Sequence, residues 1–420
     1  MESHPAVTMA GLLRQAGFGR FWLANLISNL GTSAYVLAIN WLTVKQHGAA
    51  GIATLALAYG LPQMLLQLVG GTLSDRLDRR RLFALTQASM LALAILILLA
   101  SLQEAVPLWL LALVSGANGI LSAFDTPART ALVTELVEAP RVGIAQQLYS
   151  LTASFTAIFG PALGGVLLSL GPTTRSHEEI AFAFNALSFL PLLLCIPWLP
   201  RPQAARLSPG GSSFRRSLRE GLSYVRQRTD LRTLLLLLSL VMVLGMPFQG
   251  LLPVFVQRHL SAETGHGFYA ALMAAVGLGS FVGSLLGIDL SERLRAGLLL
   301  PAAAVGLAVA VLLLCASSLL HWASLSAFLA GACGNLALSV DNALLQAGTD
   351  PQLQGRINAI ANLTKGLQSI SLALAGYTIH LLSHLAGQGS GYQPVQVAMA
   401  LALLGGVWLL WPRLQRLVLA

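Results

Sequence analysis

Residues 70–81 read Gly70-Gly71-Thr72-Leu73-Ser74-Asp75-Arg76-Leu77-Asp78-Arg79-Arg80-Arg81, a short charged segment between two long apolar runs. Residues 51–69 and 82–103 contain no charged side chain, and each run is long enough to cross a bilayer core of roughly 30 Å as a helix. This segment, called the basic stretch below, must therefore lie at a membrane surface. Because Lys and Arg concentrate in cytoplasmic loops, its arginines place that surface inside the cell.

The composition is typical of a chain that crosses a membrane many times. Of its 420 residues, 55% are hydrophobic and 10% are charged, whereas charged residues make up about a quarter of a soluble domain. The formal net charge of +9 does not indicate nucleic-acid binding, because the basic residues are dispersed over short segments. Cys195, Cys315 and Cys333 all lie in apolar runs, so we expect neither a disulfide framework nor a metal site.

Apolar runs separated by charged residues predict an all-α polytopic membrane protein with twelve membrane-spanning helices. The predicted spans are residues 20–43, 51–73, 82–102, 107–127, 143–170, 180–199, 232–257, 267–288, 297–320, 322–346, 356–386 and 394–412. Successive loops lie on opposite sides of the membrane, which puts 21 of the 25 Lys and Arg residues on the side of the basic stretch and three on the other side. Arg129 and Arg141 are among the 21. We therefore expect a multi-pass protein of the cytoplasmic (inner) membrane with both termini in the cytoplasm.

The chain is expected to divide into two pseudo-symmetric halves of six helices. The predicted segments are a cytoplasmic leader at 1–19, a first bundle at 20–199, a cytoplasmic linker at 200–231, a second bundle at 232–412 and a cytoplasmic tail at 413–420. In the linker, apolar residues recur at helical spacing from Phe214 to Val225, which predicts an amphipathic surface helix. Asp125 and Asp341, 216 positions apart, end similar segments, and this weak repeat is typical of transporters built from paired halves.

Several strings resemble the major facilitator superfamily of membrane transporters. The signature after the family's second helix is similar to Gly71-x-x-x-Asp75-Arg76-x-x-Arg79-Arg80-Arg81, with Asp78 in place of the usual glycine. The later half of the antiporter motif of its exporters is similar to Gly160-Pro161-Ala162-Leu163-Gly164-Gly165. The branch that holds enterobactin exporters and macrolide efflux proteins resembles Phe21-Trp22, Ser28-Asn29-Leu30-Gly31 and Glu220-Gly221-Leu222-Ser223-Tyr224-Val225.

The resemblance implies a conformational latch that closes the cytoplasmic side in the outward-facing state. The residues that it assigns to this latch are Gly71, Asp75, Arg76, Arg79, Arg80 and Asp125. The chemistry fits, because an arginine can bind a carboxylate through two hydrogen bonds and a helix N-terminus stabilises an acidic group. The alternative interpretation is that these arginines only set the topology.

The fifth predicted span contains a candidate antiporter-type motif. Gly160, Pro161, Gly164 and Gly165 would supply a kink and a flat helix face, because proline removes a backbone donor and glycine permits close approach. Plain helix packing is the alternative, since small residues four positions apart are common in membrane helices.

Two polar stripes are candidates for a central cavity or a coupling site. Lys365 lies about nine residues, or roughly 13 Å, into the eleventh span, where an ammonium is expected to face the protein interior. The candidate residues are Asn25, Ser28, Asn29 and Thr32 in the first span and Asp341, Asn358, Asn362, Lys365 and Ser369 in the second half. We expect Lys365 to serve an anionic or neutral polar substrate or to tune coupling, and a purely structural bond is the alternative.

Together these features predict a secondary transporter that exports small molecules by alternating access. Its partners would be a drug-, macrolide- or siderophore-like substrate and the lipid bilayer, without nucleic acid, and we expect a monomer. No phosphate-binding loop occurs in the sequence, so we expect no ATPase, no enzyme activity and no cofactor beyond possible proton coupling. A lipid flippase of the lysophospholipid type and a non-transporting receptor or scaffold remain alternatives.

The predicted topology can be tested by cysteine labelling. Cysteines introduced beside Arg79 and beside Arg215 should both react with a membrane-impermeant maleimide only from the cytoplasmic side. A cysteine beside Arg175, in a loop predicted to lie outside, is the control and should react from the opposite side. Labelling of the Arg79 and Arg215 sites from opposite faces would contradict the twelve-span scheme.

Overall fold

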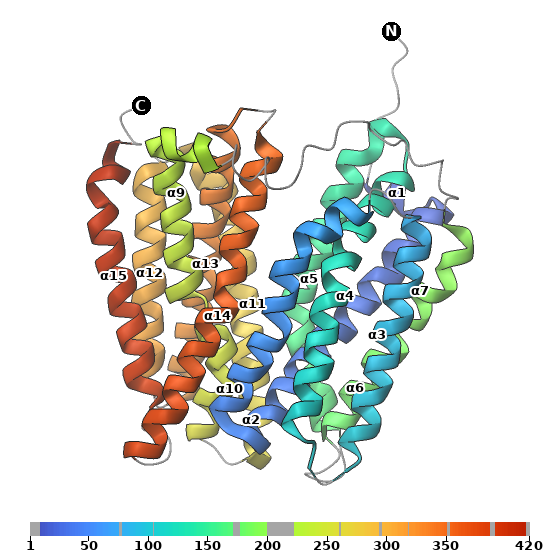
Figure 1. Ribbon diagram of the computed structural model, residues 1–420, viewed down its shortest axis with the longest axis horizontal. Helices are drawn as coiled ribbons and strands as arrows, with labels where there is room; N and C mark the ends of the chain where they lie inside the picture. The colour runs from blue at the N-terminus through green and yellow to red at the C-terminus, as the bar shows by residue number, and fades with distance from the viewer. Residues whose placement is uncertain are drawn as a thin grey trace. The chain divides into compact units, whose positions relative to one another are not determined.

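The computed structural model describes residues 9–74, 78–103, 105–170, 177–199, 222–259, 262–293, 296–317, 319–350, 353–386 and 391–416. These residues form helices joined by short turns, and no strand occurs among them. Long helices are required because hydrocarbon offers no water to backbone N–H and C=O groups, which a helix pairs internally. The expectation of an all-α membrane protein is confirmed (Figure 1).

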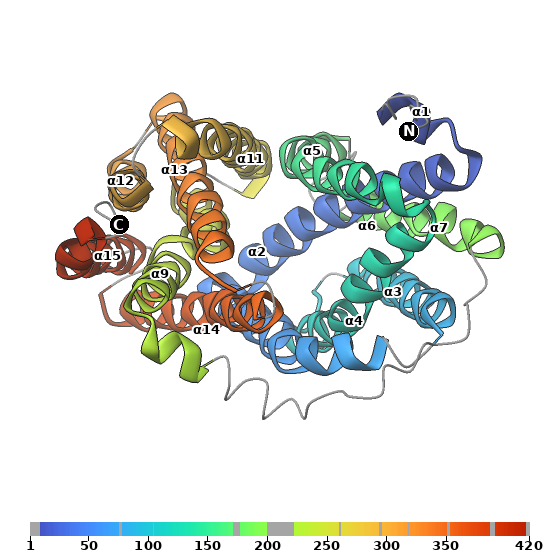
Figure 2. The same ribbon diagram turned by 90° about the horizontal axis from the view of Figure 1, so that it is seen from above.

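The helices of the first part of the chain are α1 (Met9–Leu13), α2 (Ala16–Ser74), α3 (Arg79–Ser101), α4 (Leu108–Glu135), α5 (Val142–Ser169), α6 (His177–Ser188) and α7 (Leu190–Cys195). Short 3₁₀ helices at Ala139–Arg141 and Ile196–Trp198 precede α5 and follow α7. The sixth predicted span is therefore α6 and α7 together with the second 3₁₀ helix. Figure 2, which looks along the helices, shows α3 beside α4.

The helices of the second part are α9 (Thr229–Leu240), α10 (Phe248–His259), α11 (Ala262–Arg293), α12 (Ala296–Ala316), α13 (Leu320–Ala347), α14 (Gln354–Ala386) and α15 (Tyr392–Arg416). A π-helical turn, Val241–Gly245, joins α9 to α10, so the seventh span runs from Thr229 to His259. Of the predicted linker helix, residues 222–227 are helical, and Phe214 to Gly221 lie outside the described residues.

The predicted number of spans is confirmed, although individual limits differ. In the described part of the chain, eleven helices are long and apolar enough to cross a membrane. The first of these, Gly17–Gln67, contains Gly48 at φ 60° and ψ −154°, which is not a helical conformation. Glycine adopts a positive φ without the steric cost that a Cβ imposes. This helix is therefore two spans joined at Gly48, and the two spans together are α2.

The chain groups into two compact units. The first comprises Met1–Leu42 and Ala58–Leu207, and the second comprises Thr43–Leu57 and Ser208–Ala420. The segment around Gly48 thus groups with the second unit, although most of α2 belongs to the first. In the second unit, Thr54 Oγ1 lies 2.9 Å from Tyr377 Oη, and a Cβ on Gly376 would lie 2.9 Å from the Ala49 carbonyl oxygen.

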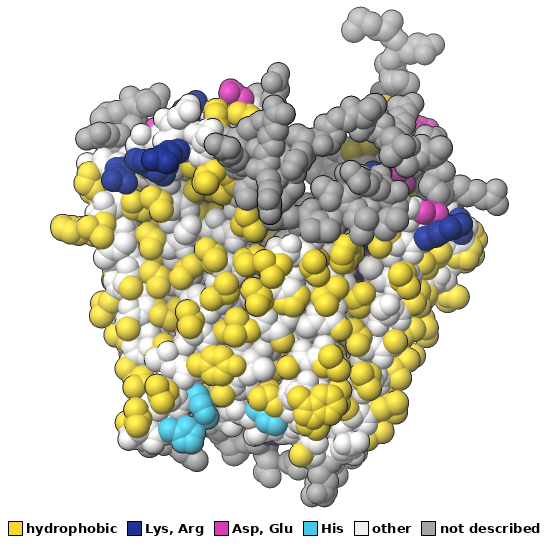
Figure 3. All heavy atoms as spheres, in the orientation of Figure 1, with side chains coloured by type: hydrophobic (Ala, Val, Ile, Leu, Met, Phe, Trp, Pro, Cys, Tyr) yellow, Lys and Arg dark blue, Asp and Glu magenta, His cyan; other side chains and the backbone are white. Residues whose placement is uncertain are grey.

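The outward faces of the helices are largely hydrophobic. Trp109, Leu374 and Leu401 are exposed, as expected for side chains that contact lipid acyl chains. In the second unit, the face shown in Figure 3 carries hydrophobic side chains along most of its length and Lys or Arg side chains near the end where α15 finishes.

Glycines bring α11 and α13 into close contact in the second unit. A Cβ on Gly279 would lie 2.0 Å from the Phe328 carbonyl oxygen, and a Cβ on Gly283 would lie 2.1 Å from the Ala332 carbonyl oxygen. Both neighbours are backbone atoms, which cannot move away as a flexible side chain can. Small residues allow the close packing on which helix association in membranes depends.

Gly279→Ala and Gly283→Ala should each destabilise the protein by roughly 1–3 kcal/mol, because an extra methyl group overpacks a tight contact. Thermal unfolding in detergent measures the effect. Gly267→Ala is the matched control, since Gly267 lies in the same helix with nothing within 4 Å of an added Cβ. Equal unfolding midpoints for all three variants would contradict the packing described above.

Candidate functional site

A buried ion pair lies inside the membrane-spanning helix α4. Asp125 and Arg129 are one helical turn apart, and only 5% of Asp125 and 7% of Arg129 are exposed. Arg129 Nε donates to Asp125 Oδ2 at 3.0 Å, and Arg129 Nη2 lies 2.8 Å from the same oxygen. Ionisable groups at such positions are expensive to bury and usually functional, so this pair is the centre of the candidate site.

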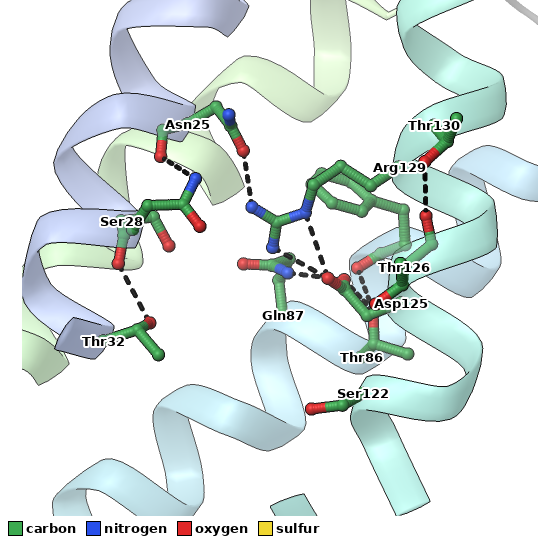
Figure 4. A network of polar contacts seen from close by, with 12 residues as sticks. Asn25, Ser28, Thr32, Thr86, Gln87, Ser122, Asp125, Thr126, Arg129 and Thr130 are labelled. Atoms are coloured by element: carbon green, nitrogen blue, oxygen red, sulfur yellow. Dashed lines mark hydrogen bonds and ion pairs between the residues drawn. The ribbon is translucent and has the colours of Figure 1, made fainter. Parts of the chain in front are cut away.

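Neighbouring helices complete the hydrogen bonds of this pair (Figure 4). From α3, Thr86 Oγ1 and Gln87 Nε2 donate to Asp125 Oδ1 at 2.9 and 2.7 Å. From α2, Asn25 accepts a hydrogen bond on its Oδ1 from Arg129 Nη1 at 2.5 Å. The carboxylate therefore accepts bonds on both oxygens, and the network ties α2, α3 and α4 together.

Aromatic side chains exclude water from one side of the network. The Arg129 guanidinium carbon lies 5.5 Å from the centroid of the Phe83 ring, which is the range of a cation–π interaction. Phe83 in turn packs against Phe21 at a centroid distance of 6.0 Å, and both rings are buried. The ion pair is thus held in a low-dielectric surrounding, where charges interact more strongly than in water.

Two polar atoms of the network lack partners. Asn25 Nδ2 and Gln87 Oε1 are buried, and no described residue gives either atom a hydrogen bond. One is a donor and the other an acceptor, so a water molecule or a polar group of a substrate would satisfy either of them. The network therefore retains one free donor and one free acceptor among the described residues.

Sequence reasoning missed Arg129, Thr86 and Gln87. It assigned Arg129 to the loop after a fourth span that ends at 127, and the structure corrects this, because α4 continues to Glu135 and buries Arg129. The available signal was the spacing of Asp125 and Arg129, since an acid and a base four residues apart form an ion pair on one helix face. That pairing allows the arginine to remain within the helix.

The described part of the predicted latch lies at the ends of α3 and α4. Gly71 is in the last turn of α2, whereas Asp75 and Arg76 lie outside the described residues. Arg79 and Arg80 open α3, and Arg79 Nη1 pairs with Glu135 Oε1 at 2.5 Å. The start of α3 is thereby tied to the end of α4.

Asp78, which replaces the glycine usual in the family, caps α3. Its Oδ1 accepts hydrogen bonds from the backbone N–H groups of Arg80 and Arg81 at 3.0 and 3.2 Å. Aspartate is a preferred N-cap residue because it satisfies free amides and interacts favourably with the positive end of the helix dipole. The departure from the family pattern thus has a local structural explanation.

The antiporter-type motif forms a close contact between α5 and the first half of α2. Gly160, Pro161, Gly164 and Gly165 are all buried. A Cβ on Gly160 would lie 2.1 Å from Ser33 Oγ, and a Cβ on Gly164 would lie 3.2 Å from Ala34 Cα. The structure therefore shows these glycines in a packing role, and their role in antiport stays a prediction.

The two polar stripes belong to different units. In α2, Asn25 and Ser28 are buried, Asn29 Nδ2 donates to the Asn25 carbonyl at 2.8 Å, and Thr32 Oγ1 donates to the Ser28 carbonyl at 2.9 Å. In the second unit, Asp341 of α13 is buried, Ser369 of α14 is half-buried and Asn362 of α14 is exposed. Asn358 and Lys365 lie in α14, but their side chains are outside the described residues. The role of either stripe as a cavity wall stays a prediction.

Comparison with solved structures identifies the fold. The fold matches a bacterial homolog of the human lysosomal transporter Spinster, in an inward-facing and unoccupied conformation, with a TM-score of 0.72. The match covers 96% of this chain and 98% of that chain at 15% identity, so it shows the fold alone. The chain therefore has the fold of that structure.

A family model shows that the chain is a transporter of the major facilitator superfamily. The model of the transmembrane secretion effector family matches residues 7–410, and the chain belongs to this family. It is 28% identical over 417 residues to the enterobactin exporter of Citrobacter koseri, covering 97% of this chain and 93% of that protein. It is 26% identical over 261 residues to the staphyloferrin A transporter of Staphylococcus aureus, covering 61% of this chain. The second match spans 64% of that relative's length.

Removing one partner of the buried ion pair should destabilise the protein strongly. Arg129→Ala leaves a buried carboxylate without its cation, and such changes cost about 3–5 kcal/mol. The double variant Asp125→Ala and Arg129→Ala should lose clearly less stability than the two single variants lose together, because no lone charge stays buried. Denaturant titration of the purified protein in detergent measures the double-mutant cycle.

Arg81→Ala is the control for this cycle. Arg81 forms an ion pair with Asp78 at 3.2 Å, but its side chain is 87% exposed, and exposed pairs contribute little. Its loss should shift the unfolding midpoint far less than the loss of Arg129. Additive effects of the two α4 substitutions would contradict the ion pair as described.

Proposed function

We propose that this protein exports small molecules across the cytoplasmic membrane as a secondary transporter that works by alternating access. The buried Asp125–Arg129 pair is the observation that carries this proposal, since ionisable groups inside membrane helices mark transport pathways and proton relays. Family membership supports transport, and the similarity to an enterobactin exporter supports export. Both termini would lie in the cytoplasm, in agreement with the distribution of arginines.

We also propose that the proton gradient drives export through Asp125. In the deprotonated state, its carboxylate accepts bonds from Thr86, Gln87 and Arg129. Binding of one proton to a carboxylate oxygen would neutralise the charge and remove the attraction to the guanidinium. The bonds from Thr86 and Gln87 of α3 to Asp125 would weaken, because they would no longer reach a charged acceptor. Arg129 would keep its bond to Asn25, so α4 would stay attached to α2. Such a change couples a proton to the packing of three helices.

The substrate proposed is a small molecule of the siderophore, macrolide or drug-like class. Two relatives named for enterobactin and staphyloferrin A support the siderophore class. The unpartnered Asn25 Nδ2 and Gln87 Oε1 offer one donor and one acceptor to such a molecule or to a water that accompanies the proton.

Proteoliposomes with the purified protein test both parts of the proposal. Radiolabelled enterobactin and erythromycin should move against their gradients when a pH gradient is imposed, and dissipation of that gradient should stop accumulation. Asp125→Asn should abolish gradient-driven accumulation but keep exchange of labelled for unlabelled substrate, because exchange needs no net proton movement.

Glu138→Gln is the matched control, since it removes the same charge from a side chain that is 76% exposed. It should transport at the wild-type rate. Failure of both compounds to move in either direction would contradict export of these classes. Wild-type accumulation by Asp125→Asn would contradict the coupling role while leaving export intact.

A further inference from the structure

Arginines gather at the end of the second unit where α9 begins and α15 finishes (Figure 3). The exposed members of this group are Arg226, Arg228, Arg232 and Arg413, called the arginine patch below. They come from three segments: residues 222–227 with the turn that follows, the first turn of α9 and the last turns of α15. The patch joins residues that are nearly two hundred positions apart in the chain.

Helix register places Arg232 and Arg413 at the same level. The helices α9 and α15 are neighbours, and a Cβ on Gly406 would lie 2.8 Å from Leu240 Cδ1. The helices run antiparallel, because α9 starts at the end where α15 stops (Figure 1). Thr233 lies seven residues before Leu240 on α9, and Arg413 lies seven residues after Gly406 on α15. At a rise of 1.5 Å per residue, both are about 10 Å from the contact, toward the same end of the helix pair. Arg232 is therefore level with Arg413 on the adjacent helix.

Each of these arginines has an exposed leucine one turn deeper on the same helix face. Leu236 follows Arg232 by four residues and is 42% exposed, and Leu409 precedes Arg413 by four residues and is 69% exposed. Trp408, on α15 near this end, is also exposed. Tryptophan is typical of the boundary between lipid head groups and acyl chains. The surface is thus cationic at its rim and apolar directly below.

The charges of Arg232 and Arg413 are not neutralised by the part of the protein that the structure describes. Of the nearby acids, Asp230 lies 3.8 Å from Arg228 Nη2, and Asp350 accepts a hydrogen bond from Tyr224 at 3.2 Å. No described carboxylate forms an ion pair with Arg232 or Arg413. Their guanidinium groups are available to an outside anion, and arginine binds phosphate through its planar fork.

We propose that Arg232 and Arg413 bind the phosphate of an anionic phospholipid, whose acyl chains lie along Leu236 and Leu409. A free phosphate would use only the cationic rim, whereas a lipid also covers the two exposed leucines. Anionic head groups attract basic residues at the membrane surface, and the arginine-rich side of this protein is the side expected to face the cytoplasmic leaflet. The site belongs to the second unit, whereas the Asp125 network belongs to the first unit.

Native mass spectrometry of the purified protein with phosphatidylglycerol and with phosphatidylcholine tests this site. The wild type should retain phosphatidylglycerol in preference to phosphatidylcholine. The double variant Arg232→Gln and Arg413→Gln should bind phosphatidylglycerol roughly thirtyfold more weakly, since each basic residue near an anionic surface contributes about 1 kcal/mol. Arg258→Gln, in the same unit but at the far end of α10, is the charge-matched control and should retain the lipid.

Two further measurements test the lipid site. Arg413→Gln alone changes only an exposed residue near the end of α15, and it should weaken retention even if the double variant does not fold. Inorganic phosphate should not raise the thermal midpoint as phosphatidylglycerol does. Wild-type retention by the folded double variant, equal loss in Arg258→Gln, or an equal midpoint shift with inorganic phosphate would overturn the proposal.

Discussion

The absence of water from the hydrocarbon core is the constraint on which this structure depends. Every polar group that enters the core must find its partner within the protein, and helices meet this demand for the backbone. Many hydroxyl side chains meet it locally by donating to the carbonyl four residues earlier, as Thr32, Thr54 and Thr152 do. Such side chains add polarity to a helix face without leaving a donor unpaired. The chain can therefore line its interior with polar groups and still consist of continuous helices.

The Asp125–Arg129 pair meets the same constraint at higher cost, because both groups carry charge. A buried ion pair contributes little net stability compared with a well-packed apolar core, but it strongly disfavours any arrangement that separates its members. Here the pair also binds residues of α2 and α3, so it specifies how three helices fit together. Asp78 caps the start of α3, and the Arg79–Glu135 pair connects the start of α3 to the end of α4. Charged contacts thus connect α2, α3 and α4 in the first unit, and Gly160 and Gly164 pack α5 on α2 there. In the second unit, glycine contacts such as that of Gly279 pack α11 on α13.

The two halves are related but chemically unequal. Asp341 occupies the position in the second unit that corresponds to Asp125 in the sequence repeat, and it is also buried. Four residues after Asp125 stands Arg129, whereas four residues after Asp341 stands Leu345. The intrahelical ion pair of α4 therefore has no counterpart on α13 at this spacing.

The sequence alone determined the number of spans and their approximate positions, because an apolar run and its flanking arginines interact with the membrane locally. The same holds for the family, whose strings around Gly71 and Gly160 are continuous in the chain. Only the tertiary structure decided that Arg129 is buried, that Asp78 caps α3 and that the segment Thr43–Leu57 groups with the second unit. Asn25 and Arg129 are 104 positions apart, and Thr86 and Asp125 are 39 positions apart. Whether a charge can enter the core depends on which distant side chains meet it there, and local sequence patterns carry no information on such encounters.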